Sequence, residues 1–388
     1  MANLYEYLDW RGDVPFQVDP FNDVDALLLA FLSYTGLEGV FLSEPLTATE
    51  AAARFFALHS VEEILAQESF VKTAPLILEK VGDCPRFAGL RVIGYINHVD
   101  EKNDEQMSAT AYLVGDGSVY VAFRGTDDTI AGWREDFNLS YLAATPGQMR
   151  ARDFLNEVLQ SAEGPVRVGG HSKGGNFAVY ASAFAESKLL KRIAQVYSFD
   201  GPGFRDEIVH SPEYEAVLPK VVSVIPESSL IGVILSGRYR HQVVKSNVTG
   251  IVQHDALSWQ VYGNRFVPGQ RSSASLYMDR VCREWLGTLS DENRKFFSDT
   301  LFSFLEGSET GSISEALSDR RRLTQDMLRV MGDMPRERRQ EFLDIIGQFV
   351  RQSMHQTTAE AITGLSSLSL LRREGAKTGA KDPDIAGM

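Results

Sequence analysis

The stretch GPVRVGGHSKGGNFAVYAS, residues 164–182, decides the fold of this chain. Alternating valines at residues 166–168 are typical of a short strand, and the small residues after the last double glycine favour a helix. Between them, GHSKG at residues 170–174 matches the pattern G-x-S-x-G. A serine on a sharp strand-to-helix turn exposes its hydroxyl, and the glycines leave room where strand and helix approach closely. The stretch therefore predicts a nucleophile at Ser172, with a structural glycine turn as the alternative.

The rest of the chain supplies the strands and helices that such a turn requires. Alternating apolar runs flank the sequence GDG at residues 115–117, which is a hairpin signal. Further β-rich runs lie at residues 90–100, 193–200, 218–227 and 239–246, and a helical segment lies at 146–163. Strands that alternate with helices are typical of an α/β protein. We therefore expect a mostly parallel central sheet flanked by helices.

Changes of pattern along the chain indicate three regions. Residues 1–285 hold the strands together with an N-terminal helical part, in which TATEAAARFFALHS opens with a capping-box pattern. From about residue 275 the β signal disappears, and apolar residues recur at helical spacing. We expect a helical C-terminal segment at residues 286–370. A disordered tail is expected at residues 371–388, because that sequence is polar and rich in glycine.

Composition and charge exclude several classes of protein. The 388 residues carry a formal net charge of −13, whereas nucleic-acid binding requires a basic face. The two cysteines, Cys84 and Cys282, lie far apart and outside any Cys/His cluster, so neither a disulfide nor a zinc site is expected. The first residues lack the pattern of a signal peptide, and no apolar run is long enough to span a membrane. We expect a cytoplasmic protein without metal, cofactor or nucleic-acid partner.

A nucleophilic serine requires a general base, and in α/β-hydrolases the chain order is serine, acid, histidine. Four histidines follow Ser172, at positions 210, 241, 254 and 355. His254 lies in GIVQHDALSW, a loop after the last β run, which is where the base of such an enzyme belongs. His254 is therefore the expected base, with a surface-loop histidine as the alternative.

The acid that orients this base has three candidates. Asp200 ends the β run AQVYSFD, and Glu227 ends the next run, KVVSVIPE. Catalytic residues of α/β proteins gather at such strand ends. The acid usually follows the second strand after the nucleophile, which favours Glu227 over Asp200. Asp200 has an alternative role in the turn DGPG, and Asp255 is disfavoured because it adjoins His254 in the chain.

An oxyanion hole needs two backbone N–H groups aimed at the developing negative charge. One is expected from Lys173, the residue after the nucleophile, and the other from the loop after an earlier strand. The strong β run VYVAF ends at Phe123, so Thr126 in the following turn is the natural second donor. An ordinary strand-end turn is the alternative for this segment.

Two motifs resemble those of the class 3 lipases. VAFRGTDDTIAGWREDF at residues 121–137 resembles their strand followed by F-R-G-[ST], a variable loop, a tryptophan and an acidic residue, with Thr126, Trp133 and Asp136 in these positions. GGHSKGG resembles the nucleophile turn of that family. The catalytic aspartate of these lipases precedes a V-P pair, whereas Glu227 follows its proline.

Over residues 3–285 the chain resembles a bacterial lipase-like family of unassigned function, through segments such as LYEYLDWRGD, SFDGPGF and QHDALSW. The resemblance implies an α/β-hydrolase fold and a Ser–acid–His site, without implying a substrate. The loop at residues 127–133 falls where class 3 lipases carry a lid. Here it is short and acidic, which argues against a membrane-binding lid.

These features predict a serine hydrolase of the carboxylesterase or lipase-like kind, which cleaves acyl esters through an acyl-enzyme. A thioesterase or amidase would use the same site, and a non-catalytic hydrolase-fold binding protein is a second alternative. The expected substrate is a small acyl ester or a lipid-like molecule. The apolar residues 230–235 either line an acyl pocket or pack in the core. Lys173 either meets an anionic substrate group or pairs with a surface carboxylate.

Overall fold

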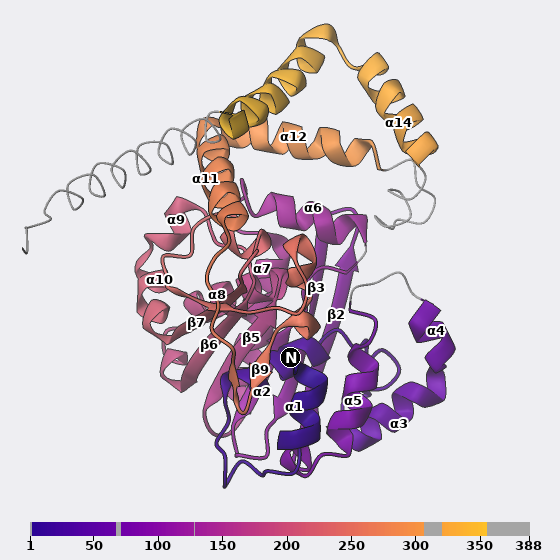
Figure 1. Ribbon diagram of the computed structural model, residues 1–388, viewed down its shortest axis with the longest axis vertical. Helices are drawn as coiled ribbons and strands as arrows, with labels where there is room; N and C mark the ends of the chain where they lie inside the picture. Colours follow the sequence, from indigo (N-terminus) through magenta and orange to yellow (C-terminus); the bar gives the residue numbers. More distant parts are fainter. Residues whose placement is uncertain (1, 67–70, 128, 306–319, 355–388) are drawn as a thin grey trace, which may run out of the picture.

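A computed structural model describes residues 2–66, 71–127, 129–305 and 320–354. Over these residues the chain forms a sheet of eight strands that lie side by side in the order of the sequence (Figure 1). The strands are β1 (Leu46–Thr47), β2 (Arg91–Asp100), β3 (Glu105–Leu113), β4 (Val119–Phe123), β5 (Val166–His171), β6 (Ile193–Phe199), β7 (Val221–Pro226) and β8 (His241–Val244). A separate ribbon pairs β9 (Val261–Tyr262) with β10 (Arg265–Phe266).

The sheet is mixed, which corrects the expectation of a mostly parallel sheet. The pairings from β1 to β4 are antiparallel, whereas the pairings from β4 to β8 are parallel. The connections explain the antiparallel pairings of β2 with β3 and of β3 with β4, because residues 101–104 and 114–118 are too few for a crossover. The hairpin predicted around residues 115–117 is confirmed, with Leu113 opposite Val119.

Helices cover both faces of the sheet (Figure 1). The N-terminal helices are α1 (Leu4–Arg11), α2 (Asp23–Leu32), α3 (Ala48–Leu58), α4 (Val61–Ala66) and α5 (Ala74–Gly82). The helices between later strands are α6 (Ile130–Asn138), α7 (Pro146–Ser161), α8 (Lys173–Ala183), α9 (Asp206–Val209) and α10 (Pro212–Val217). Short 3₁₀ turns also connect the elements: η1 (Pro85–Phe87), η2 (Leu190–Arg192), η3 (Leu218–Lys220), η4 (Ile231–Val233), η5 (Gly250–His254) and η6 (Ala256–Ser258).

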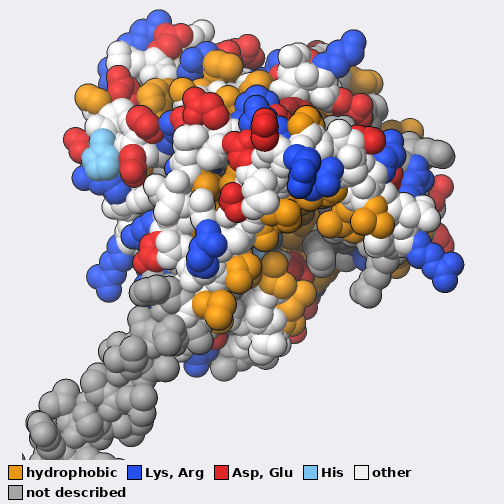
Figure 2. Space-filling view, turned by 90° about the horizontal axis from the view of Figure 1, so that it is seen from above, with side chains coloured by type: hydrophobic (Ala, Val, Ile, Leu, Met, Phe, Trp, Pro, Cys, Tyr) orange, Lys and Arg blue, Asp and Glu red, His pale blue; other side chains and the backbone are white. Residues whose placement is uncertain are grey.

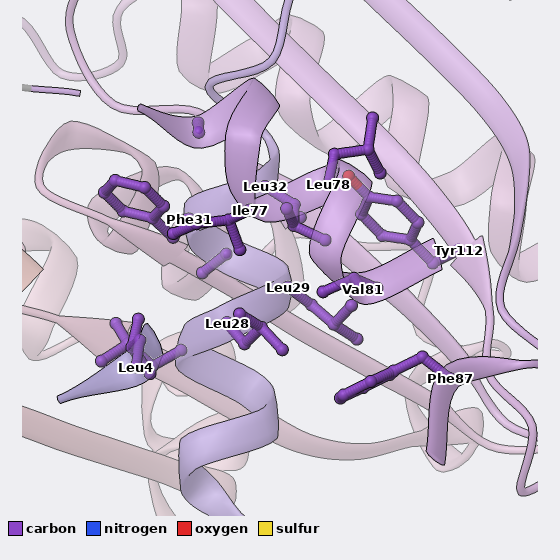
Figure 3. Close-up of a cluster of buried hydrophobic side chains, with 14 of the residues drawn as sticks. Leu4, Leu28, Leu29, Phe31, Leu32, Ile77, Leu78, Val81, Phe87 and Tyr112 are labelled. Carbon is purple, nitrogen blue, oxygen red and sulfur yellow. The ribbon is translucent and has the colours of Figure 1, made fainter. Parts of the chain in front are cut away.

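Side-chain alternation divides the core between the two faces of the sheet. On β4, Tyr120 and Ala122 pack in the cluster that contains α2 and α5, whereas Val121 and Phe123 pack in the cluster that contains α7 and α8. Figure 3 shows part of the first cluster, with Leu28, Leu29, Phe31 and Leu32 of α2 near Ile77, Leu78 and Val81 of α5. Because both faces are covered, the ends of the central strands are held in fixed positions.

The C-terminal helices stand over the end of the sheet at which the parallel strands finish (Figure 1). They are α11 (Ser273–Thr288), α12 (Asp291–Ser303), α14 (Arg320–Asp333) and a helix at residues 336–354. The described part of residues 286–370 is thus largely helical. The segment at residues 371–388, for which disorder is expected, lies outside the described residues.

Aromatic contacts tie these helices to one another and to the α/β part of the chain. The Trp285 ring of α11 packs edge-on to Phe297 of α12 and to Phe349. Phe302 of α12 packs edge-on to Phe137 of α6, at a centroid distance of 5.4 Å. The helix α6 therefore has a C-terminal helix against its outer side.

Candidate active site

Ser172 lies between the last residue of β5 and the first residue of α8. Its backbone has φ +58° and ψ −135°, a conformation that is uncommon for a residue other than glycine. Its N–H donates a 2.9 Å hydrogen bond to the carbonyl oxygen of Phe199, at the end of the neighbouring strand β6. A strained strand-to-helix turn of this kind lifts the serine hydroxyl out of the sheet.

The two glycines of the G-x-S-x-G pattern are required by close backbone contacts. A Cβ atom on Gly170 would clash with the backbone of Gly174, and a Cβ atom on Gly174 would clash with the carbonyl oxygen of Phe123. Strand β5, helix α8 and the end of β4 therefore meet with no room for a side chain. This contact is the steric reason why the sequence pattern could be recognised.

His254 forms a hydrogen-bonded pair with Asp200. The His254 Nδ1 atom lies 2.7 Å from Asp200 Oδ2, and the imidazole is partly exposed whereas the carboxylate is buried. The other oxygen, Oδ1, accepts a hydrogen bond from the Ser229 hydroxyl and a 3.1 Å bond from the N–H of Gly232. Hydrogen bonds to both oxygens fix the orientation of the carboxylate.

The other two acid candidates face different partners. Glu227 follows the last residue of β7, and its carboxylate accepts a weak 3.4 Å hydrogen bond from the N–H of Gln270. The Asp255 carboxylate accepts a bond from the N–H of Leu257 in η6, and burial raises the pKa of that carboxyl. In the described residues, Asp200 is the candidate whose carboxylate hydrogen-bonds the His254 ring. The contacts therefore favour Asp200, against the preference for Glu227 drawn from strand order.

His171 joins the turn at Ser172 to the loop that carries His254. Its Nε2 lies 2.8 Å from the backbone oxygen of His254, and the two rings lie 4.6 Å apart between centroids. Its Nδ1 lies 2.9 Å from the hydroxyl of Tyr34, two residues beyond α2. Burial lowers the pKa of His171 to about 3, so the ring is neutral at ordinary pH. The structure thus places the His254 loop directly beside the strand end that carries Ser172.

Sequence reasoning missed both Tyr34 and His171. His171 occupies the variable position before the serine in G-x-S-x-G, where the pattern asks for no particular residue. Tyr34 ends the apolar run DVDALLLAFLSY, which indicates a buried helix and nothing about a site. Its partner His171 lies 137 residues further along the chain. The one signal in the sequence was the GHS triplet, because the nucleophile turn of the class 3 lipases also has a histidine before the serine.

The loop after β4 lies against the serine. A Cβ atom on Gly125 would lie 3.0 Å from the Cβ of Ser172. The Thr126 hydroxyl donates a hydrogen bond to Asp136 of α6, and burial raises the pKa of that carboxyl to about 6. Lys173 is the first residue of α8, so its N–H has no partner within the helix. The residue before Thr126 thus lies against Ser172, and Lys173 follows Ser172 directly; their roles as oxyanion donors stay a prediction.

The Lys173 side chain is fully buried. Its ammonium lies 3.2 Å from a carboxylate oxygen of Glu135 and 3.2 Å from the carbonyl oxygen of Gly132, both in α6. It also lies over the Phe177 ring, 5.5 Å from the centroid. The structure thus corrects both alternatives drawn from the sequence, because the partner is a buried carboxylate of α6. The ion pair holds α6 against the first turn of α8.

Lys173→Met is expected to lower the free energy of unfolding by about 3–5 kcal/mol, because it leaves the buried Glu135 carboxylate without its cation. Chemical denaturation followed by circular dichroism measures the loss. Lys188→Met is the matched control, since it removes the exposed ion pair with Glu186 and should cost no more than about 1 kcal/mol. Equal losses in the two variants would contradict the structural role given to Lys173.

Exposed apolar side chains lie in η5, the turn that ends at His254, and on α6. Ile251 and Val252 precede His254 in η5 and are 63% and 49% exposed, and Trp133 of α6 is 38% exposed. Seen from the side of the C-terminal helices, hydrophobic side chains lie exposed among the charged ones (Figure 2). In the segment 230–235, Gly232 and Val233 are buried, and the other four residues are half-buried. The segment serves the site through Gly232, which holds Asp200.

Two further features bear on the class of protein. Within residues 2–66, 71–127, 129–305 and 320–354, no three His, Cys, Asp or Glu side chains are grouped as metal ligands. In the same ranges, no helix has the length and apolar character needed to cross a membrane. The mixed sheet, with helices on both faces and a serine at a strand-to-helix turn, is consistent with the α/β-hydrolase fold.

The chain belongs to the Mbeg1-like family, whose model matches residues 81–303 and so more than half of the sequence. That range contains Ser172, Asp200 and His254. No curated protein matches the chain.

Two solved structures of lipases are similar to part of the chain. M37 lipase is 15% identical, with a TM-score of 0.35, over 54% of this chain and 69% of the lipase. The lipase of Rhizomucor miehei, in complex with its propeptide, is 16% identical, with a TM-score of 0.32, over 52% of this chain and 78% of the lipase. Likeness at this level carries no information about the substrate of this chain.

Proposed function

We propose that this protein is a serine hydrolase that cleaves acyl esters, with Ser172 as nucleophile, His254 as base and Asp200 as the orienting acid. The observation that carries the proposal is the 2.7 Å hydrogen bond between His254 and the buried Asp200. The loop that carries His254 is hydrogen-bonded to His171, the residue before the strained turn of Ser172. A neutral histidine paired with a carboxylate is the arrangement that activates a serine hydroxyl.

In the first half of the reaction, Asp200 accepts the Nδ1–H of His254 and leaves the Nε2 lone pair free for the serine proton. The Ser172 oxygen attacks the acyl carbonyl as its proton passes to His254. The oxyanion receives hydrogen bonds from the N–H groups of Thr126 and Lys173. The alcohol then leaves with the proton from His254, and the acyl group remains on Ser172.

In the second half, a water molecule gives its proton to His254 and attacks the acyl carbonyl. The carboxylic acid leaves as Ser172 regains its proton from the imidazolium. The Asp200 carboxylate stabilises the positive charge on His254 in both halves, and the hydrogen bonds from Ser229 and Gly232 hold it in place. In the described part of the chain Ser172 makes no hydrogen bond to His254. Such bonds commonly tighten only when substrate is bound.

The apolar side chains next to His254 in the chain suit the acyl part of an ester or a lipid-like substrate. Ile251 and Val252 lie in the turn that ends at His254 and offer exposed apolar surface, and burying this surface against an acyl chain is favourable. A thioester or amide substrate would use the same residues. We also propose a cytoplasmic location for the protein. Cys84 and Cys282 are free thiols, as is usual for proteins of that compartment.

A fluorophosphonate probe tests the proposal directly. The Ser172 oxygen is expected to attack phosphorus and displace fluoride, giving a stable phosphonyl adduct. Peptide mapping by mass spectrometry should place the adduct on Ser172 of the wild type, and Ser172→Ala should show none. An adduct elsewhere, or no adduct on the folded wild type, would overturn the proposal. The second result would favour the non-catalytic binding protein.

A further inference from the structure

The hydroxyl of Tyr34 contacts two segments of the candidate site directly and is linked to a third through His171. Its oxygen lies 2.9 Å from His171 Nδ1 and packs closely against Gly125. A Cβ atom on Gly125 would clash with this hydroxyl. Gly125 adjoins the oxyanion donor Thr126, and His171 adjoins Ser172. The third segment is the His254 loop, whose backbone oxygen accepts from His171.

Chemistry allows one arrangement of protons in this chain of hydrogen bonds. The backbone oxygen of His254 can only accept, so the His171 ring must carry its proton on Nε2. Because the ring is neutral, Nδ1 bears a lone pair and accepts from the Tyr34 hydroxyl. Burial raises the pKa of Tyr34, so the phenol keeps the proton that it donates.

We propose that Tyr34 is a positioning residue for the proposed hydrolysis. Through Gly125 and His171, its hydroxyl sets the distance between the oxyanion donor Thr126, the nucleophile Ser172 and the backbone of His254. The inference rests on the proposed function. Reacting groups must be held within about 0.5 Å of their productive geometry, and a displacement of about 1 Å can cost 100-fold in rate.

The N-terminal part of the chain thereby contributes to the site. Tyr34 follows α2, which is buried along its length in the core cluster that also contains α5. Its ring packs against Phe31 of α2, at a centroid distance of 5.8 Å, and edge-on to His171 at 5.9 Å. The phenol is therefore carried on a rigid helix end, which suits a group that fixes three loops.

The test compares Tyr34→Phe with a matched control in the full chain. Tyr34→Phe removes the hydroxyl and keeps the ring. Tyr120→Phe removes another buried hydroxyl, which donates to the Ala26 oxygen of the same helix α2 and does not touch the site. We expect Tyr34→Phe to lower kcat and the rate of fluorophosphonate labelling by about 10- to 100-fold, with KM within about 2-fold. Tyr120→Phe should keep kcat within about 2-fold of the wild type.

Substitutions of His171 provide an independent readout. His171→Gln offers an amide N–H that can replace Nε2–H and donate to the His254 oxygen, whereas His171→Leu offers no donor. We expect His171→Gln to label at least 5-fold faster than His171→Leu. Faster labelling of His171→Gln than of His171→Leu is a result that a packing role alone would not produce. This comparison can be made even if Tyr34→Phe fails to fold.

The outcomes separate this inference from the proposed function. If the wild type labels on Ser172 and Tyr34→Phe labels as fast as Tyr120→Phe, the positioning role is refuted while the proposed function stands. Equal labelling of the two His171 variants would refute it in the same way. If the folded wild type does not label on Ser172, the proposed function itself fails.

Discussion

Ser172→Ala is expected to lower kcat for ester hydrolysis by about 10⁴- to 10⁶-fold, because it removes the atom that forms the acyl-enzyme. The remaining rate over water would come from the oxyanion donors and from substrate binding. Initial rates with p-nitrophenyl esters of increasing acyl length measure the loss and also define which chain lengths are accepted.

The variant should retain the stability of the wild type, because alanine keeps the backbone and removes only the hydroxyl. Ser161→Ala, at the exposed C-terminal end of α7, serves as the control and should hydrolyse esters at the wild-type rate. If Ser172→Ala keeps more than a tenth of wild-type kcat, Ser172 is not the nucleophile.

Asp200→Asn is expected to lower kcat by about 10³- to 10⁴-fold, because the hydrogen bonds around Asp200 force the amide into one orientation. Ser229 and Gly232 both donate to Oδ1, so the amide oxygen would keep that position and the amide nitrogen would face His254. An N–H donor at that place requires His254 Nδ1 to accept. The ring proton then moves to Nε2, where it blocks transfer from Ser172.

Glu227→Gln is the matched control for Asp200→Asn, since both replace a carboxylate by an amide at the end of a strand. The Glu227 carboxylate contacts Gln270 and not the His254 ring, so its kcat should stay within about 3-fold of the wild type. The pH dependence of kcat/KM should also be unchanged. A large loss of kcat in Glu227→Gln, together with an active Asp200→Asn, would show that Glu227 is the acid, as the order of the strands suggests.

The sequence predicted the parts of the fold that depend on contacts close along the chain. The turn at Ser172 could be recognised because Gly170 and Gly174 are required by the same strand-to-helix contact that defines the pattern. The hairpin from β3 to β4 could be recognised from its turn residues. The mixed character of the sheet was missed. The short connection between β2 and β3 makes the two strands antiparallel, but the sequence alone does not show that they are neighbours in the sheet.

The candidate site was harder to predict, because its pairings are distant in the sequence. Asp200 and His254 lie 54 residues apart, and Asp200 differs from Glu227 in its hydrogen bond to His254 and in the donors Ser229 and Gly232 that hold it there. Counting strands gives no information about such donors. The partner of Lys173 lies 38 residues earlier in the chain, and burial of both charges cannot be inferred from either segment alone.

The attachment of α6 on two sides has a consequence for exchange with solvent. On one side of α6, the Glu135 carboxylate accepts hydrogen bonds from Lys173 and from the backbone N–H groups of Gln106 and Gly147. Elsewhere on this helix, Phe137 packs against Phe302 of α12. Releasing the helix would separate a buried ion pair and expose aromatic surface at the same time. Its amide hydrogens therefore exchange with deuterium only when a large part of the protein opens, so the helix beside the serine belongs to a slowly opening unit of the fold.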